Sequence, residues 1–278
     1  MPTSSNERRG DPNVAVLLTW FLPGAGHLYV GRTALGLLVL VLIEGLYALG
    51  WFLADGRTFE YLDPELRGPF ATLLTPEAGN LGALLLHLKS SGFGASEPMP
   101  FPGAMLLGGY LTSLSGVLNL FVAAHVHLCA RTVRAPSPSA RNPALLLACA
   151  WLVPGLGHWL QGRRLRGTLV FVLLAGLFVV GTGLAAGTNL SRERHFYYWS
   201  GQFLLGAPSV LFEFFAGHPR VTGELRWVDV GLLYACMAGL LNVLAMLDVC
   251  GVAEKRWFEA APSAAEPAKE PASSEVPA

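Results

Sequence analysis

Four apolar runs constrain this chain most, because each has the roughly 20 residues that a helix needs to cross a lipid bilayer. The runs are Ala34–Ala54, Gly103–Leu128, Gly167–Gly187 and Val228–Cys250. Only 14% of the residues are charged, whereas a typical soluble domain has roughly 25%. A soluble protein with this many apolar runs would have no polar face to present to water. The sequence therefore predicts an all-α fold, a polytopic helical bundle in a membrane.

A motif of thirteen residues occurs twice and divides the chain into two related halves. Residues 20–32 read WFLPGAGHLYVGR, and residues 151–163 read WLVPGLGHWLQGR. Seven of these positions are identical, where background amino-acid frequencies would give about one match. We therefore predict two internal repeats that lie parallel to each other in the membrane.

The repeats set the expected domain boundaries. We expect repeat 1 at residues 13–131, a cytoplasmic linker rich in Arg and Pro at residues 132–142, and repeat 2 at residues 143–258. The N-terminus, residues 1–12, is short and polar, and the tail, residues 259–278, consists mainly of Ala, Pro, Glu and Ser. Neither segment has enough apolar residues to form a core, so we expect both to be disordered.

The Pro-Gly break inside each motif leaves two topologies open. Pro23 and Pro154 remove a backbone donor and should end or kink the short apolar helix before them. The chain then either returns as a re-entrant hairpin or continues across the membrane, which gives a total of about four to eight spans. The bias of Lys and Arg favours the hairpin with both termini cytoplasmic, because full crossing would place the arginines from Arg163 onward outside. The third apolar segments of the halves, Phe70–Leu88 and His195–Gly217, are weaker, and we expect them to be interfacial or partly inserted.

The repeated motif supplies most of the candidate functional residues. His27 and His158 follow the break; they either satisfy backbone carbonyls that the break leaves free, or bind a metal, pass a proton or hold a lipid phosphate together with the nearby arginine. The arginines are expected to contact lipid phosphates at the interface. The candidate motif residues are Pro23, Gly24, Gly26, His27, Gly31, Arg32, Pro154, Gly155, Gly157, His158, Gly162 and Arg163.

A metal site is not expected from this pattern. Each motif has one histidine, whereas zinc takes three or four protein ligands. His125 and His127 could join His27, but residues two apart on a helix face in different directions. The four cysteines form no Cys-x-x-Cys pair and lie in or beside apolar runs, so we expect buried thiols without disulfides. We therefore predict no metal and no cofactor.

Three polar residues lie inside the predicted spans. Asn119 and Asn242 occupy matching positions, and each is followed six residues later by a polar residue, His125 or Asp248. Each asparagine lies about one turn after a glycine, where helices approach closely and amides hydrogen-bond between them. Glu44 is an intramembrane carboxylate, which is costly and marks a functional hypothesis. Its counterpart in the second half is an alanine, so the duplicated unit does not require it.

The motif and the helix that follows it resemble the transmembrane-two domain family and its uncharacterised bacterial relatives. The resemblance is carried by Pro-Gly-x-Gly-His, by the Gly-Arg pair four residues on, and by Tyr29, for which the second copy has Leu160. The stretch Leu240–Asp248 is similar to the closing helix of the bacterial relatives. The resemblance implies a unit made of a short hydrophobic segment, a Gly/aromatic turn and a second helix. It implies no catalytic residues.

These observations leave three function classes open. The sequence contains no P-loop, no Gly-x-Ser-x-Gly, no HExxH and no dinucleotide fingerprint, which favours a non-enzymatic scaffold or accessory subunit. A small transporter or channel would have a site between the repeats, lined by Glu44, His27 and His158. A membrane enzyme acting on lipid would need both histidines, Arg32 and Arg163 in one pocket.

The expected partners and location follow from composition. Membrane lipid is one expected partner and a membrane protein is a possible second. The formal net charge is zero, so no basic field recruits nucleic acid. The Ala-, Gly-, Leu- and Arg-rich composition suggests a bacterial inner membrane.

Overall fold

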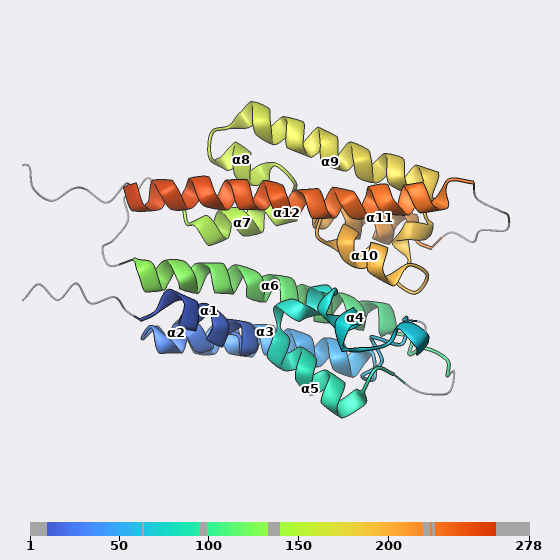
Figure 1. Cartoon of the computed structure of the whole chain (residues 1–278), viewed down its shortest axis with the longest axis horizontal. Coiled ribbons are helices and arrows are strands. Elements are labelled where there is room, and N and C mark those ends of the chain that lie inside the picture. The colour runs from blue at the N-terminus through green and yellow to red at the C-terminus, as the bar shows by residue number, and fades with distance from the viewer. Residues whose placement is uncertain are drawn as a thin grey trace, which may run out of the picture.

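The predicted all-α membrane bundle is confirmed by a computed structural model of the chain. The structure describes residues 10–62, 64–94, 99–132, 140–218, 223 and 226–259. These residues form twelve α-helices and three 3₁₀ helices and no strand (Figure 1). The predicted disorder of both chain ends falls almost entirely outside the described residues, and so does most of the predicted linker. Four helices are long and apolar enough to cross a membrane: α3 (Thr33–Leu53), α6 (Met105–Arg131), α9 (Arg164–Leu184) and α12 (Val228–Glu259).

Each predicted span coincides with one of these helices, but several ends differ. The final helix, α12, continues to Glu259, whereas the apolar run ends at Cys250. Hydropathy marks only the part of a helix that lipid surrounds, and residues such as Glu254 and Lys255 are good helix formers in water. For the same reason α9 begins three residues before its apolar run, at Arg164. The apolar pattern therefore located the spans, underestimated the length of α12 and placed α9 three residues too late.

The exposed surface of the long helices is apolar, as a lipid-facing surface has to be. Val41 on α3 is 69% exposed and Leu173 on α9 is 65% exposed, and neighbouring Leu and Val side chains are exposed to similar degrees. A water-soluble protein would present such side chains only in small patches. The described structure therefore has the surface of a membrane-embedded protein.

The two halves run in the same direction. In each half, one long helix leaves the end of the molecule at which α1 (Pro12–Phe21) begins, and a second long helix returns to that end (Figure 1). In the first half, α6 packs on α3 and α1, and in the second half, α12 packs on α9 and on α7 (Pro143–Leu152). The halves meet where α6 packs against α7. The two halves therefore contain matching helices that run in the same directions.

The segment before each first span is a hairpin. In the first half, α1 ends at the break and α2 (Ala25–Tyr29) returns, so that the backbone N–H of Asp11 donates to the hydroxyl of Tyr29 at 3.3 Å. In the second half, α8 (Leu156–Leu160) returns in the same way, and residues before α7 and after α8 line one shared cavity. The chain therefore forms a hairpin at each break, which is the shape that the re-entrant topology requires.

A third segment enters each half from the opposite end. In the first half it is broken into α4 (Pro69–Leu73), a 3₁₀ turn at Pro76–Gly79 and α5 (Leu81–Ser91). In the second half it is broken into α10 (Phe196–Phe203) and α11 (Ala207–Ala216). The sequence predicted one weak helix in each place. The breaks arise at a proline and at a glycine with positive φ, neither of which suits a helix interior.

In each half, the motif segment and the third segment are both broken, and they meet near the middle of the bundle. Trp20 at the end of α1 donates from its indole N–H to the carbonyl of Ala78, 2.7 Å away. In the second half, Gly206 lies so close to the end of α7 that a Cβ there would clash with the carbonyl of Trp151. Each half therefore consists of two full spans and two half-length segments that approach each other from opposite ends.

Candidate functional site

The glycines of the motif fix where its histidine lies. Gly24 has a φ of 84° and Gly155 has a φ of 82°. Residues that have a Cβ rarely adopt this backbone conformation. A Cβ at either glycine would clash with a backbone carbonyl oxygen of the following span, that of Gly36 or Gly167. The break is therefore pressed against the first turns of α3 and α9. The short helix that starts there points its histidine toward the last long helix of the same half.

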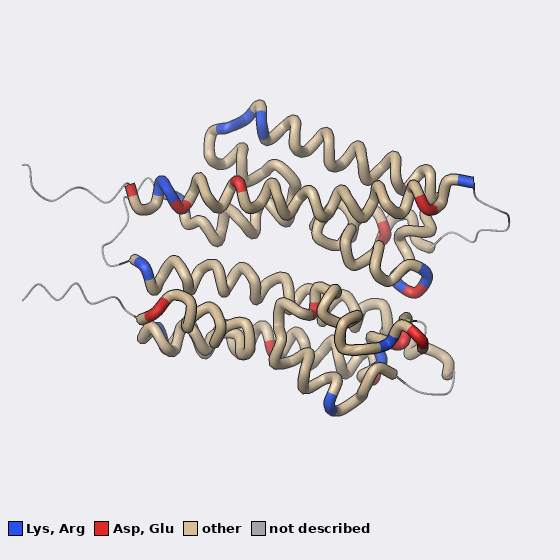
Figure 2. The backbone as a smooth tube through the Cα atoms, in the orientation of Figure 1, with Lys and Arg blue, Asp and Glu red and all other residues tan. Residues whose placement is uncertain are grey.

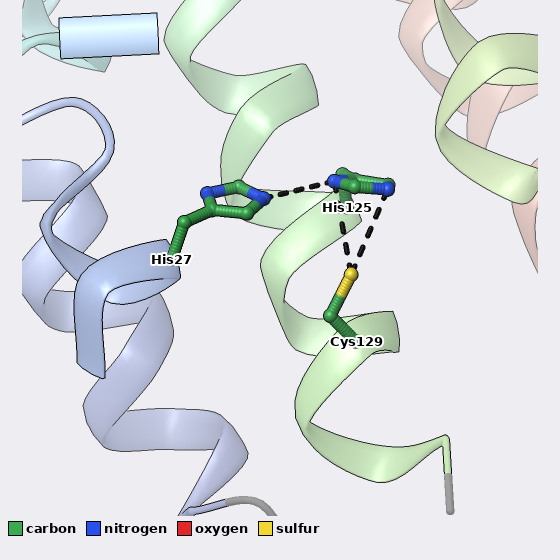
Figure 3. A group of neighbouring side chains, drawn as sticks. All are labelled: His27, His125 and Cys129. Carbon is green, nitrogen blue, oxygen red and sulfur yellow. Dashed lines mark hydrogen bonds between the residues drawn. The ribbon is translucent and has the colours of Figure 1, made fainter. Parts of the chain in front are cut away.

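In the first half, the motif histidine contacts a second histidine and a cysteine (Figure 3). His27 is 1% exposed, and its Nε2 lies 2.9 Å from Nδ1 of His125 on α6. The two rings stack with centroids 5.1 Å apart. The thiol of Cys129, one turn further along α6, lies 3.8 Å from His125 Nδ1 and 3.6 Å from His125 Nε2. Burial, and then the neighbouring His125 and Arg32, lowers the pKa of His27 to about 4, so this ring is neutral at pH 7.

In the second half, the equivalent histidine contacts a carboxylate instead. His158 is 1% exposed, and its Nε2 lies 3.0 Å from Oδ2 of Asp248 on α12. The same carboxylate accepts from Arg163 at 2.7 Å and lies 3.4 Å from Arg166. Burial lowers the pKa of His158, and the hydrogen bond to Asp248 works in the opposite direction. Three cationic or basic groups therefore share one carboxylate at this end of α12.

The structure changes two sequence-based interpretations of the motif. The histidines contact side chains of α6 and α12 rather than the backbone carbonyls that the break leaves free. Arg163 pairs with Asp248, whereas the sequence suggested a lipid phosphate as its partner. The residues six places after Asn119 and Asn242 are the ones that the histidines contact, so their matching positions were the signal for this arrangement.

The two asparagines satisfy carbonyls at the meeting points of the broken segments. The amide of Asn119 donates to the carbonyls of Thr19 and Gly79, at 2.8 and 2.9 Å. The amide of Asn242 donates to the carbonyl of Leu204 at 3.0 Å and lies 3.4 Å from that of Ala150. Backbone groups inside a membrane need such partners because no bulk water is present. Each asparagine thus holds together two half-length segments.

Glu44 lies at the side of the first half, in a cavity of about 290 Å³ that Tyr47 and His87 also line. One of its carboxylate oxygens is buried without a hydrogen-bond partner in the described structure. Tyr47 and His87 are hydrogen-bonded to each other at 3.1 Å, and the other ring nitrogen of His87 lies 3.0 Å from the carbonyl of Gly56. The sequence identified Glu44 and did not identify this histidine.

A buried ion pair joins the halves, and nothing in the sequence pattern indicated it. Glu77 and Arg192 are 0% and 1% exposed, and Arg192 donates to Glu77 Oε1 at 2.8 Å. The hydroxyls of Thr112 and Ser113 on α6 donate to the same oxygen, each at 2.9 Å. The guanidinium also donates to the carbonyl of Gly109 at 2.9 Å. Arg192 belongs to a Ser-Arg-Glu-Arg stretch that reads as a solvated loop, so no local pattern indicates its burial.

A second buried carboxylate also departs from expectation. Glu213 lies in the third apolar segment of the second half, which the sequence predicted to be interfacial or partly inserted, and it is 4% exposed. It accepts hydrogen bonds from the hydroxyl of Tyr110 and from the indole of Trp199, and it pairs with His218 at 2.9 Å. Because Tyr110 belongs to α6, this cluster is a second polar connection between the halves.

The described contacts keep the two motifs apart. His27 contacts residues of the first half and His158 contacts residues of the second half. Figure 1 shows α2 and α8 on opposite sides of the pair formed by α6 and α12. The lipid-enzyme hypothesis requires both histidines and both arginines in one pocket, and the described residues do not form such a pocket.

Three cavities of the described structure are lined by none of the twelve candidate motif residues, although other motif positions, such as Trp20, Trp151 and Gln161, do line them. One of about 400 Å³ lies at the ends of α7, α8 and α12. Two larger ones, of about 760 and 700 Å³, lie between the halves and have mainly apolar linings. The Pro, Gly, His and Arg positions that the two motif copies share therefore lie outside these spaces.

Comparison with known proteins yields one match. A family model described as a family of unknown function (DUF6677) matches residues 14–137 and 145–257. The two matched segments cover most of the chain and coincide with its two halves, which fits the predicted duplication. No curated protein and no solved structure gives a significant match.

Proposed function

We propose that this chain, which belongs to the DUF6677 family of unknown function, is a non-enzymatic integral membrane protein that acts as a scaffold or accessory subunit. The observation that supports this proposal is that the polar side chains of the motif and the spans contact other parts of the protein. Asn119 and Asn242 hold the broken segments, His158 contacts Asp248, and Glu77 pairs with Arg192. These contacts stabilise the fold, and neither His27, His158 nor the motif arginines line a described cavity.

We also propose that the protein lies in a bacterial inner membrane with both termini in the cytoplasm. Figure 2 shows Lys and Arg gathered, together with some Asp and Glu, at the end where α9 begins and where α6 and α12 finish. The described basic residues outnumber the acidic ones at this end. Excess Lys and Arg mark the cytoplasmic side of a membrane protein. The described basic residues at the proposed cytoplasmic end are Arg32, Arg131, Arg141, Arg163, Arg164, Arg166, Lys255 and Arg256.

The resemblance to the transmembrane-two domain family belongs to the same proposal. In each half, a ten-residue helix is followed by a Pro-Gly turn and then by a span of 21 residues. This is the unit that the resemblance implies, and here it occurs twice. Each unit is completed by a third segment and a second span, which extend the short motif into a half of the bundle.

Complementation tests the scaffold proposal. In cells lacking the gene, Glu44→Gln and His158→Ala are expected to restore any phenotype of the deletion as well as the wild type does, because neither side chain would carry chemistry. Immunoblots of isolated membranes must show equal amounts of each variant. A variant that is present at the wild-type level and fails to complement would contradict the proposal.

A small transporter or channel is the second candidate, and the broken segments favour it. Half-length segments that meet near the midplane form the substrate sites of many transporters. Glu44, with its unpartnered carboxylate oxygen, would be the titrating group. This candidate predicts that the wild type accelerates the decay of an imposed proton gradient in proteoliposomes and that Glu44→Gln abolishes the effect. The scaffold proposal predicts that, with either the wild type or Glu44→Gln, the proton gradient decays as slowly as it does in protein-free liposomes.

A further inference from the structure

We propose that His27, His125 and Cys129 bind a zinc ion at the proposed cytoplasmic end of the first half. The ligand atoms would be Nε2 of His27, Nδ1 of His125 and the thiolate sulfur of Cys129. All three lie within 4.8 Å of one another in the structure. Figure 3 shows His27 and Cys129 both directed toward the ring of His125. The site goes beyond the scaffold proposal and does not depend on it.

The distances between the ligand atoms are close to those of a tetrahedral zinc site. Zinc–nitrogen bonds of about 2.0–2.1 Å and zinc–sulfur bonds of about 2.3 Å place neighbouring ligand atoms about 3.3–3.6 Å apart. The two nitrogens are 2.9 Å apart, and the sulfur is 3.8 Å from His125 Nδ1. The ligand atoms of His27 and Cys129 lie within 4.8 Å of each other, so side-chain movement of up to about 1 Å would bring all three ligands to these distances.

The ligands are held by elements that have little freedom to move. His125 and Cys129 lie four residues apart on α6, so they face the same side of one helix. His27 lies on α2, whose position is fixed at Gly26, where a Cβ would clash with the carbonyl of Ala15 in α1. Ligands on rigid elements lose little entropy on binding and keep the geometry of the site.

The chemistry of the ligand set points to zinc rather than to a hard cation. Imidazole and thiolate bind zinc and related transition metals, whereas Mg²⁺ and Ca²⁺ take oxygen ligands. The His27 and Cys129 side chains are 1% and 4% exposed, so water does not compete for them freely. Binding would release the Cys129 proton to solvent, and the thiolate that forms would offset part of the added charge near Arg32. Three protein ligands leave the fourth position of the ion open.

The second half of the molecule provides an internal comparison. The repeat alignment places Asp248 at the position of His125 and Val252 at the position of Cys129. There the motif histidine contacts a carboxylate that two arginines share, and no thiol occupies the matching position. The fold thus needs neither a second histidine nor a cysteine at this point. The first half nevertheless has zinc-binding residue types at both positions, His125 and Cys129. A purely structural role does not explain this feature.

Cobalt titration of the full-length protein in detergent tests the site. Co²⁺ is a spectroscopic substitute for zinc, and we expect a thiolate-to-cobalt charge-transfer band that saturates at about one ion per chain and is displaced by Zn²⁺. Cys129→Val, which copies the second half, should remove the band and weaken zinc binding by about 100-fold or more. Cys250→Ala and His158→Ala are the matched controls and should leave both unchanged.

A second variant separates loss of ligands from loss of fold. His125→Asn should also remove the band while the thermal unfolding temperature without metal stays close to that of the wild type. Zinc should raise that temperature for the wild type and not for either ligand variant. The proposal is overturned if the wild type gives no charge-transfer band, or if Cys129→Val keeps the band and the zinc affinity of the wild type.

Discussion

Replacing Arg192 by methionine is expected to lower the free energy of unfolding by about 3–5 kcal/mol, because it leaves the Glu77 carboxylate buried without its cation. Glu77 is 0% exposed and accepts from Arg192, Thr112 and Ser113, and the two hydroxyls cannot balance a full charge. The loss should appear in the SDS or thermal unfolding curve of the protein in detergent.

The double variant Glu77→Met with Arg192→Met separates the charge from the packing. Replacing both members of a buried ion pair by apolar residues is often neutral or stabilising, so the double variant should recover more than half of the loss. Glu193→Gln, in the exposed residue next to Arg192, is the control and should change stability by less than about 0.5 kcal/mol. If Arg192→Met unfolds like the wild type, the pair does not join the halves as described.

Alanine at Gly24 or Gly155 is expected to prevent most of the protein from folding. Each glycine combines a positive φ with a backbone oxygen in the space that a Cβ would occupy. The strained conformation costs about 1–2 kcal/mol. The clash requires backbone movement of the following span, so we expect a total loss on the order of 4 kcal/mol or more. The measurement is the yield of monodisperse protein after extraction from membranes, followed by the unfolding curve of what remains.

The same spans supply matched controls. Gly45 and Gly176 occupy equivalent positions in α3 and α9, and neither has a positive φ. A Cβ added at either position would have no neighbouring atom within 4 Å. Gly45→Ala and Gly176→Ala should therefore leave yield unchanged or raise it slightly, because alanine favours a helix over glycine. Yields for Gly24→Ala and Gly155→Ala that equal those of the controls would show that the break is not packed as described.

The parts of the fold that depend on local sequence were predictable. The four spans follow from apolar length, and the Pro-Gly breaks follow from the loss of a backbone donor at Pro23 and Pro154. The motif repeat is enough to identify equivalent elements in the two halves. The bias of Lys and Arg favoured hairpins at the breaks, and the structure has hairpins there.

The parts that depend on contacts between distant segments were not predictable. Glu77 and Arg192 are 115 residues apart. Glu77 belongs to the weak apolar segment Phe70–Leu88, and Arg192 belongs to a stretch that reads as a solvated loop. His125 was considered as a partner of His27, but Cys129 was read as an isolated buried thiol. Only the packing of α2 on α6 shows that these three side chains meet. Sequence spacing within one helix identifies shared faces and says nothing about which distant helix lies opposite.

Cysteine accessibility in intact cells and inverted vesicles tests the central claim, which is that each half crosses the membrane twice and that its motif hairpin is re-entrant. Single exposed positions would be replaced in a cysteine-free background and treated with a membrane-impermeant maleimide. Asn13 and Thr33 flank the first hairpin, Leu165 follows the second, and Glu65 and Glu193 lie at the other end.

We predict that cysteines at positions 13, 33 and 165 react only from the cytoplasmic side and that cysteines at positions 65 and 193 react only from outside. Reaction of position 33 or 165 from the side opposite to position 13 would contradict the account. It would mean that a motif segment crosses the membrane completely, so that the two halves could not have the parallel two-span arrangement on which the proposals for this protein rest.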